Sequence, residues 1–174
     1  MIRSVACSFL LCFTFASQSA CRAGIEVHDA AETAAARQTL LGRWYGEKIL
    51  EEGSHQRWLM ERFTDGTYRI DFELTSPNNS IESWSETGIW GVRLPIYFTV
   101  TQTMGQNDLL KLTNASDPSF YDAYHVQTLA KDSFVYESYT SGNVFQTSKV
   151  DSNFRLDIRT TALTLPMTPG RSAP

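Results

Sequence analysis

The segment Leu40–Gly46, with the sequence LLGRWYG, marks the point at which the hydrophobic pattern of this chain changes. The alanine-rich stretch His28–Leu41 is typical of a helix, whereas the residues after it alternate between apolar and polar with the period of a β-strand. This alternation continues almost to Arg159 without a second helical segment. Parallel strands need long crossover connections, usually helices. The chain therefore has to build its sheet as an antiparallel meander.

Short strand-like segments follow one another at spacings of roughly 8–12 residues, which is typical of all-β folds. The clearest is Tyr68–Thr75, where apolar and charged residues alternate, and the Asp65-Gly66 turn before it is typical of a tight hairpin. The predicted strands are Trp44–Leu50, Gln56–Phe63, Tyr68–Thr75, Ile81–Trp90, Ile96–Thr103, Leu109–Thr113, Ala123–Leu129, Ser133–Tyr139, Val144–Val150 and Phe154–Arg159.

A meander of this length leaves two exposed strand edges unless it closes on itself. We therefore predict an all-β fold in which an up-and-down antiparallel meander of eight to ten strands closes into a barrel. A two-sheet sandwich is the alternative. Asp29 and Glu32 cap the predicted helix and Gly42 ends it. Because this helix is rich in alanine, we expect it to lie on a surface or to plug one end of the barrel.

Residues 1–24 have the pattern of an export signal. Arg3 supplies the positive charge, Val5–Ala16 is apolar and small residues follow, so cleavage is expected after Ser19 or Ala23. Twelve apolar residues are too few to cross ~30 Å of hydrocarbon as a helix, so we predict no transmembrane segment. The protein is expected to be exported, either to the periplasm or to the medium.

The cysteines leave two alternatives for the mature N-terminus. Cys7 and Cys12 are lost with the signal, so no internal disulfide is expected. If a bacterial lipoprotein peptidase cleaves before Cys21 instead, a lipid on that residue anchors the protein to a membrane. The sequence is compatible with both the soluble and the lipidated form.

The remaining chain predicts one domain, residues 28–159, followed by a proline-containing tail, residues 160–174, that we expect to be disordered. Loss of Arg3 with the signal removes one positive charge and changes the formal net charge from −4 to −5. This mild acidity argues against nucleic acid as a partner.

The sequence LLGRWYGE after a short helix resembles the first motif of the lipocalins, members of the calycin superfamily. The resemblance extends to bacterial exported lipocalin-like domains through an FTDGTY turn at Phe63–Tyr68 and a GIW sequence at Gly88–Trp90. It covers roughly residues 38–159. It implies the same barrel that the alternation predicts.

The resemblance also implies roles for single residues. Gly42 would let the chain cross the barrel base, and Trp44 would close that end. A late arginine, Arg155 or Arg159, would stack on this tryptophan. The sequence SFYDAY at Ser119–Tyr124 is loosely similar to a later lipocalin motif.

No catalytic constellation is visible in the sequence. The histidines His28, His55 and His125 are far apart, and none lies at metal-ligand spacing from another ligand. Neither a nucleophile elbow nor a phosphate-binding glycine loop occurs. We therefore predict no catalytic residues, no metal site, no cofactor and no enzyme activity.

Two acidic residues stand out because they lie on the same face of a predicted strand as a tryptophan. Glu82 and Glu86 are each two residues from Trp84, so they are candidates to point into the barrel with it. Burial of carboxylates is costly. The alternative is therefore a local irregularity of this strand near Gly88.

The aromatic-rich face of the predicted strands leads to a functional hypothesis. We predict a non-enzymatic, exported lipocalin-like protein that binds a small hydrophobic or amphipathic molecule inside the barrel. The alternative is a protein-interaction module with a filled barrel, an accessory or inhibitor of an envelope protein. An interior pocket of ~300 Å³ or more would favour the first. The predicted ligand-binding residues are Tyr68, Ile70, Phe72, Tyr97, Tyr124 and Tyr136.

We expect export to leave a mature N-terminus between Ala20 and Gly24. Intact-mass measurement of protein purified from its own host tests this expectation. An acylated Cys21 at the N-terminus would identify the lipidated form. Retention of residues 1–18 would contradict export.

Overall fold

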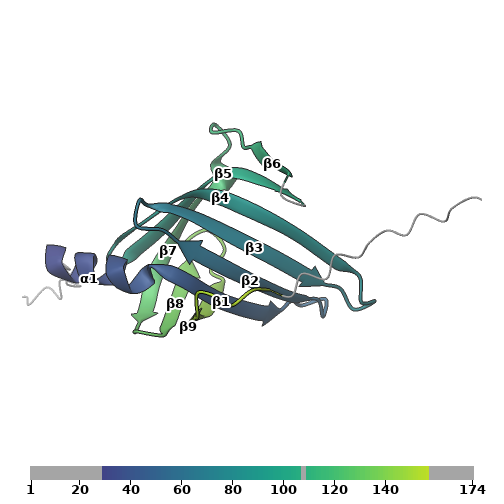
Figure 1. The fold of residues 1–174 in the computed structure, drawn as a ribbon, viewed down its shortest axis with the longest axis horizontal. Coiled ribbons are helices and arrows are strands. Elements are labelled where there is room, and N and C mark those ends of the chain that lie inside the picture. The colour runs from purple at the N-terminus through teal and green to yellow at the C-terminus, as the bar shows by residue number, and fades with distance from the viewer. Residues whose placement is uncertain (1–28, 107–108, 157–174) are drawn as a thin grey trace, which may run out of the picture.

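All strand-like segments between residues 42 and 150 form strands, and each strand runs antiparallel to its neighbours (Figure 1). The computed structural model describes residues 29–106 and 109–156. One helix, α1 (Ala30–Leu40), precedes the sheet. The strands are β1 (Gly42–Ile49), β2 (His55–Arg62), β3 (Thr67–Thr75), β4 (Ile81–Arg93), β5 (Ile96–Gln106), β6 (Leu109–Leu112), β7 (Tyr121–Leu129), β8 (Ser133–Ser138) and β9 (Val144–Val150).

The sheet closes into a barrel because β1 pairs with β9 as well as with β2, and β4 pairs with β5. The closed ring runs β1-β2-β3-β4-β5-β7-β8-β9 and follows the chain in up-and-down order. Strand β6 is an addition that pairs with the end of β5 at Thr103–Gln106, beyond the part of β5 that pairs with β7. The predicted all-β barrel is confirmed, and the sandwich alternative is wrong.

The predicted last strand, Phe154–Arg159, is wrong in its described part. Residues 151–156 form a turn and an extended segment that crosses the outside of β1 and β2 (Figure 1). The Arg43 guanidinium donates a hydrogen bond to the Phe154 carbonyl at 2.7 Å, and the Phe154 ring packs on Tyr45 with centroids 5.4 Å apart. Strand β9 already occupies the edge of β1, so no edge remains for a further strand. Residues 157–174 and the predicted signal, with Cys21, lie outside the described residues.

Helix α1 covers one end of the barrel. The Asp29 carboxylate accepts a hydrogen bond from the backbone N–H of Glu32 at 2.7 Å, as an N-cap does. Gly42 has a φ of +85° and redirects the chain from the helix into β1. Within the helix only Ala36 and Leu40 are buried, so its C-terminal part packs on this end and the rest projects away from the barrel (Figure 1).

Trp44 lies inside the barrel beneath the helix and is fully buried. Its indole N–H donates to the Leu40 carbonyl at 3.0 Å, and its ring meets the edge of Phe134 at a centroid distance of 6.1 Å. The ammonium of Lys149 lies 5.4 Å above the indole ring and donates to the Thr39 carbonyl at 2.9 Å. Trp44 thus connects the helix to the barrel base.

Among the described residues, the cation over Trp44 is Lys149 and not Arg155, one of the two arginines that the resemblance implies. Lys149 is directly paired with Trp44 across the β1–β9 ladder, which brings its ammonium to both the ring and the helix C-terminus. Arg155 instead donates to the carbonyls of Ser152 and Phe154, each at 2.8 Å. Arg159 lies outside the described residues.

We expect Trp44→Ala to lower the free energy of unfolding by ~3–5 kcal/mol, because it removes a fully buried ring and leaves a cavity. Chemical denaturation measures the loss. Tyr139→Ala, at an aromatic residue that is 58% exposed, is the control and should change stability by less than about 1 kcal/mol. Equal stability of the Trp44 variant and wild type would contradict its role at the base.

Candidate functional site

The barrel interior is not completely filled. A cavity of about 190 Å³ lies against Met60 and Tyr97, which belong to the buried core and form the floor of the cavity. The structure brings all six predicted ligand-binding residues into its wall: Tyr68, Ile70, Phe72, Tyr97, Tyr124 and Tyr136. The wall also contains Met60, Glu86, Thr99, Thr101 and Asp122, which the sequence analysis did not name as ligand-binding residues.

The strand period explains why these side chains meet. Tyr68, Ile70 and Phe72 alternate along β3, so all three point to the same face. The antiparallel register sets Ile70 opposite Glu86 and continues through β5, where Tyr97 is opposite Tyr124. In a closed barrel this shared face is the interior, and the cavity wall is therefore assembled from neighbouring strands.

Four aromatic rings form the continuous core below and beside the cavity. The Tyr97 ring stacks on Tyr124 at a centroid distance of 5.5 Å and contacts Phe134 and Tyr136 edge-on at 5.4 and 5.5 Å. Tyr124 also meets Tyr136 edge-on at 5.0 Å. Such edge and offset contacts hold the rings in fixed orientations. The aromatic wall is thus ordered by its own packing.

A buried arginine supports the floor. Arg62 is 2% exposed, and its Nε and Nη2 donate to the Tyr97 hydroxyl at 3.2 and 2.9 Å. Its guanidinium also lies 4.9 Å from the Tyr97 ring centroid and 5.5 Å from that of Phe134. No carboxylate in the described part of the chain forms an ion pair with it. Cation–π contacts and the tyrosine hydroxyl therefore stabilise its charge.

The tyrosine hydroxyls in the wall are protonated over the whole physiological range. Burial raises the pKa of Tyr68, Tyr124 and Tyr136 well above the ordinary value of 10.0. The Tyr68 hydroxyl lies 2.8 Å from the Thr101 hydroxyl, and either can donate. The wall therefore offers neutral hydroxyl groups beside apolar ring surface.

Glu86 contributes a carboxyl group from β4. Its Oε1 accepts from the Trp84 indole at 3.3 Å, and its Oε2 accepts from the Thr101 hydroxyl at 3.2 Å. Burial is the largest cause that raises the pKa of this carboxyl above its ordinary range. Glu82 and Glu86 were both expected on the same strand face as Trp84. Glu86 reaches the cavity, whereas Glu82 is exposed. The expected irregularity is also present, as a register shift between Thr87 and Gly88.

Asp122 contributes a second carboxyl group, from β7. Its side chain lines the cavity, and it forms no hydrogen bond or ion pair with any other side chain in the described ranges. Burial raises its pKa above the ordinary value of 3.8. Asp122 was not among the predicted site residues because the predicted strand starts at Ala123, whereas β7 begins at Tyr121. The signal available was its position two residues before the inward-facing Tyr124.

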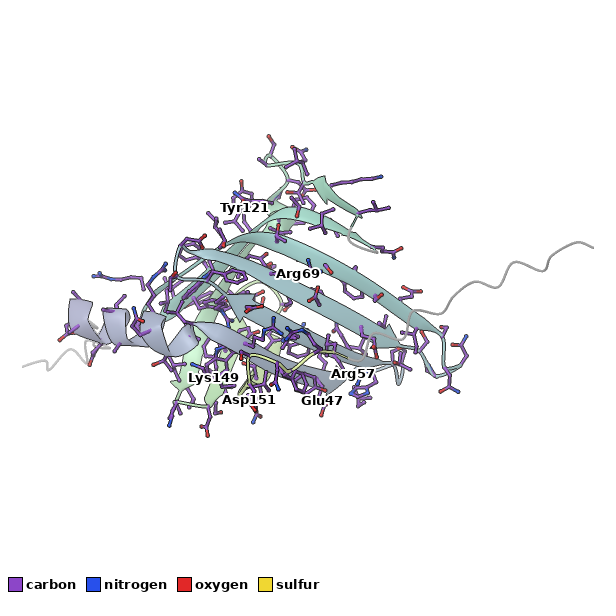
Figure 2. All side chains as sticks on the ribbon, viewed as in Figure 1. Glu47, Arg57, Arg69, Tyr121, Lys149 and Asp151 are labelled. Atoms are coloured by element: carbon purple, nitrogen blue, oxygen red, sulfur yellow. The ribbon has the colours of Figure 1, made fainter. Side chains whose placement is uncertain are left out.

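Two other hollows lie on the outside of the barrel. One, of about 260 Å³, separates β1–β3 from the C-terminal segment and is lined in part by Arg69 and Leu156. The other, of about 750 Å³, is an open surface groove where the C-terminal segment begins, and its lining includes Lys149 and Asp151, which Figure 2 labels. Neither is enclosed by the sheet, so the interior cavity is the better candidate for a specific site.

The described histidines lie away from the cavity. His55 contacts Glu47 on the outside of the barrel at 3.2 Å, and the His125 ring packs near Tyr139. Among residues 29–106 and 109–156 no three histidine, cysteine or acidic side chains are grouped as metal ligands. In the same ranges no helix has the length and apolar character needed to cross a membrane.

Comparison with known proteins adds likenesses among solved structures. No family model and no curated protein sequence matches the chain. Among solved structures, a lipocalin-like protein from Bacteroides uniformis ATCC 8492 aligns with 64% of this chain and 99% of its own, at 13% sequence identity and a TM-score of 0.38.

We expect Asp122→Asn to raise the melting temperature at about pH 7. Burial raises the pKa of this carboxyl, so its ionisation costs more free energy in the folded than in the unfolded protein. The resulting loss of stability is absent below the unfolded-state pKa and grows as pH rises through the folded-state pKa. Thermal melts across pH should therefore show the gain disappearing below about pH 3.8, the ordinary value.

Asp132→Asn is the matched control, because Asp132 is exposed in the turn between β7 and β8. It should leave the melting temperature unchanged. An Asp122→Asn protein that melts below wild type at neutral pH would show that the carboxylate is stabilised in the fold.

Proposed function

Because the chain has a lipocalin-like fold, a closed eight-stranded up-and-down barrel with a helix at one end, we propose that it binds one small hydrophobic or amphipathic molecule inside the barrel. The observation that carries this proposal is the interior cavity of about 190 Å³. Its wall contains both apolar side chains and hydroxyl groups. A ligand with an apolar body and a polar group would satisfy both kinds of surface.

The size of the cavity limits the ligand. The cavity is smaller than ~300 Å³, the volume that we expected of a ligand-binding pocket. This value is the lower end of the range for pockets that bind drug-sized ligands. An apolar protein cavity of roughly 150 Å³ is nevertheless large enough to hold benzene. We therefore narrow the ligand to a molecule of about one ring or a short chain.

The alternative function, an interaction module with a filled barrel, has less support. It requires a packed interior, and the six predicted residues instead surround an open space. The lipocalin-like fold is also generally non-enzymatic, which supports binding rather than catalysis. Export to the periplasm or the medium is part of the proposal and is supported by the signal pattern of residues 1–24.

We expect toluene to bind the wild-type protein with a dissociation constant of about 0.1–1 mM, a binding free energy of about −4 to −5.5 kcal/mol. Ile70→Trp should abolish this binding, because the larger ring fills the cavity from β3. Overpacking is expected to lower stability by ~1–3 kcal/mol without unfolding the domain. Isothermal titration and a thermal melt of each variant measure the two effects.

Ile89→Trp is the control, because Ile89 is 40% exposed and its side chain is not part of the cavity wall. It should bind toluene like wild type. Equal binding by Ile70→Trp and wild type would place the ligand elsewhere, and no binding to either protein would contradict the proposed function.

A further inference from the structure

The cavity wall combines two kinds of side chain. Met60 on β2 and Ile70 and Phe72 on β3 supply apolar surface. Glu86 on β4 and Asp122 on β7, the two strands that flank the first half of β5, supply carboxyl groups, and Glu86 is directly opposite Ile70 in the β3–β4 ladder. A ligand in this space therefore meets hydrocarbon and carboxyl groups beside one another.

Within the part of the chain that the structure describes, no lysine or arginine balances these carboxyl groups. Neither Glu86 nor Asp122 forms an ion pair with a lysine or arginine in the described ranges. The buried cation of the barrel, Arg62, is directed at the Tyr97 hydroxyl instead. The negative charge of Asp122 also disfavours ionisation of Glu86, which adds to the effect of burial on the pKa of Glu86. The cavity lacks the positive charge that would pair with them.

From this arrangement we infer that the ligand is a small organic cation, in which a protonated amine is carried on one ring or a short apolar chain. The inference rests on the proposed function, because it names the class of ligand for the same cavity. An ammonium group has three N–H donors and no acceptor, which suits carboxyl and hydroxyl oxygens. The faces of the surrounding tyrosine rings attract the same charge.

Other classes of ligand fit the wall less well. An anionic ligand would bring a further negative charge next to Glu86 and Asp122, and among the described residues the cavity wall contains no lysine or arginine to pair with it. A calcium ion takes six to eight oxygen ligands, more than two carboxyl groups supply, and the cavity is too large for a single bare ion. A neutral apolar molecule would leave the Asp122 carboxyl without a partner. Of these classes, only the small organic cation satisfies both the apolar side chains and the carboxyl groups of the wall.

Three single-ring probes of similar size separate these possibilities: benzylamine, benzyl alcohol and benzoate. At about pH 7 the first is a cation, the second is neutral and the third is an anion. We expect isothermal titration to show benzylamine binding about tenfold more tightly than benzyl alcohol, because a charged hydrogen bond is worth roughly that factor. Benzoate should bind least tightly.

Substitutions at the two carboxyl groups test the cause of this order. Asp122→Asn and Glu86→Gln keep the shape of each side chain, and each should reduce the preference for benzylamine over benzyl alcohol toward one. Glu82→Gln and Asp132→Asn are the controls, because both acids are exposed. They should keep the wild-type preference. The Asn variant is expected to be at least as stable as wild type, so a lost preference would not reflect unfolding.

The outcomes distinguish this inference from the proposed function. If benzyl alcohol binds as tightly as benzylamine and Ile70→Trp abolishes both, the cavity binds ligands but the inference is wrong. If the preference for benzylamine persists in both carboxyl variants, the charge is recognised elsewhere and the inference is also wrong. If no probe binds at millimolar concentration, both the inference and the proposed function are overturned.

Discussion

The pairing of β1 with β9 is the contact on which the rest of the structure depends. It joins the first and last strands of the sheet from Arg43↔Val150 to Gly46↔Thr147 and removes both exposed edges. Closure also creates an interior with two open ends. One end is filled by Leu40 and Trp44, which enter from the helix and from β1, the same strand that closes the ring. The segment from the end of α1 through β1 therefore both fills the barrel base and closes the ring of strands.

A glycine at the β4–β5 contact links this closure to the candidate site. The register shifts between Thr87 and Gly88, and a Cβ at Gly88 would collide with the Val100 carbonyl and crowd the Tyr68 ring. Only glycine allows the two strands to approach here. Bulges of this kind change the direction of neighbouring side chains. Glu86, just before the shift, lines the cavity and contacts Thr101 on β5.

The sequence predicts the parts of this molecule that depend on local periodicity. Alternation located the strands and placed Tyr68, Ile70 and Phe72 on one face, and the need to cover the sheet edges predicted closure. Features that depend on contacts between distant parts of the chain could not be predicted from the sequence. Lys149 lies over Trp44, where Arg155 was one expectation, because the β1–β9 register pairs residues 44 and 149. Asp122 was missed because hydrogen bonds to β5 extend β7 toward its N-terminus.

A packed floor and a mixed wall together would make a small cavity selective. Hydrogen bonds from Arg62 and contacts with neighbouring rings position Tyr97, so a longer ligand would have to displace this ring. In the proposed complex the apolar body of the ligand contacts Met60, Ile70 and Phe72, and its ammonium group lies next to Glu86 and Asp122. The two carboxyl groups would then select for positive charge, and the aromatic floor would limit the length of the ligand.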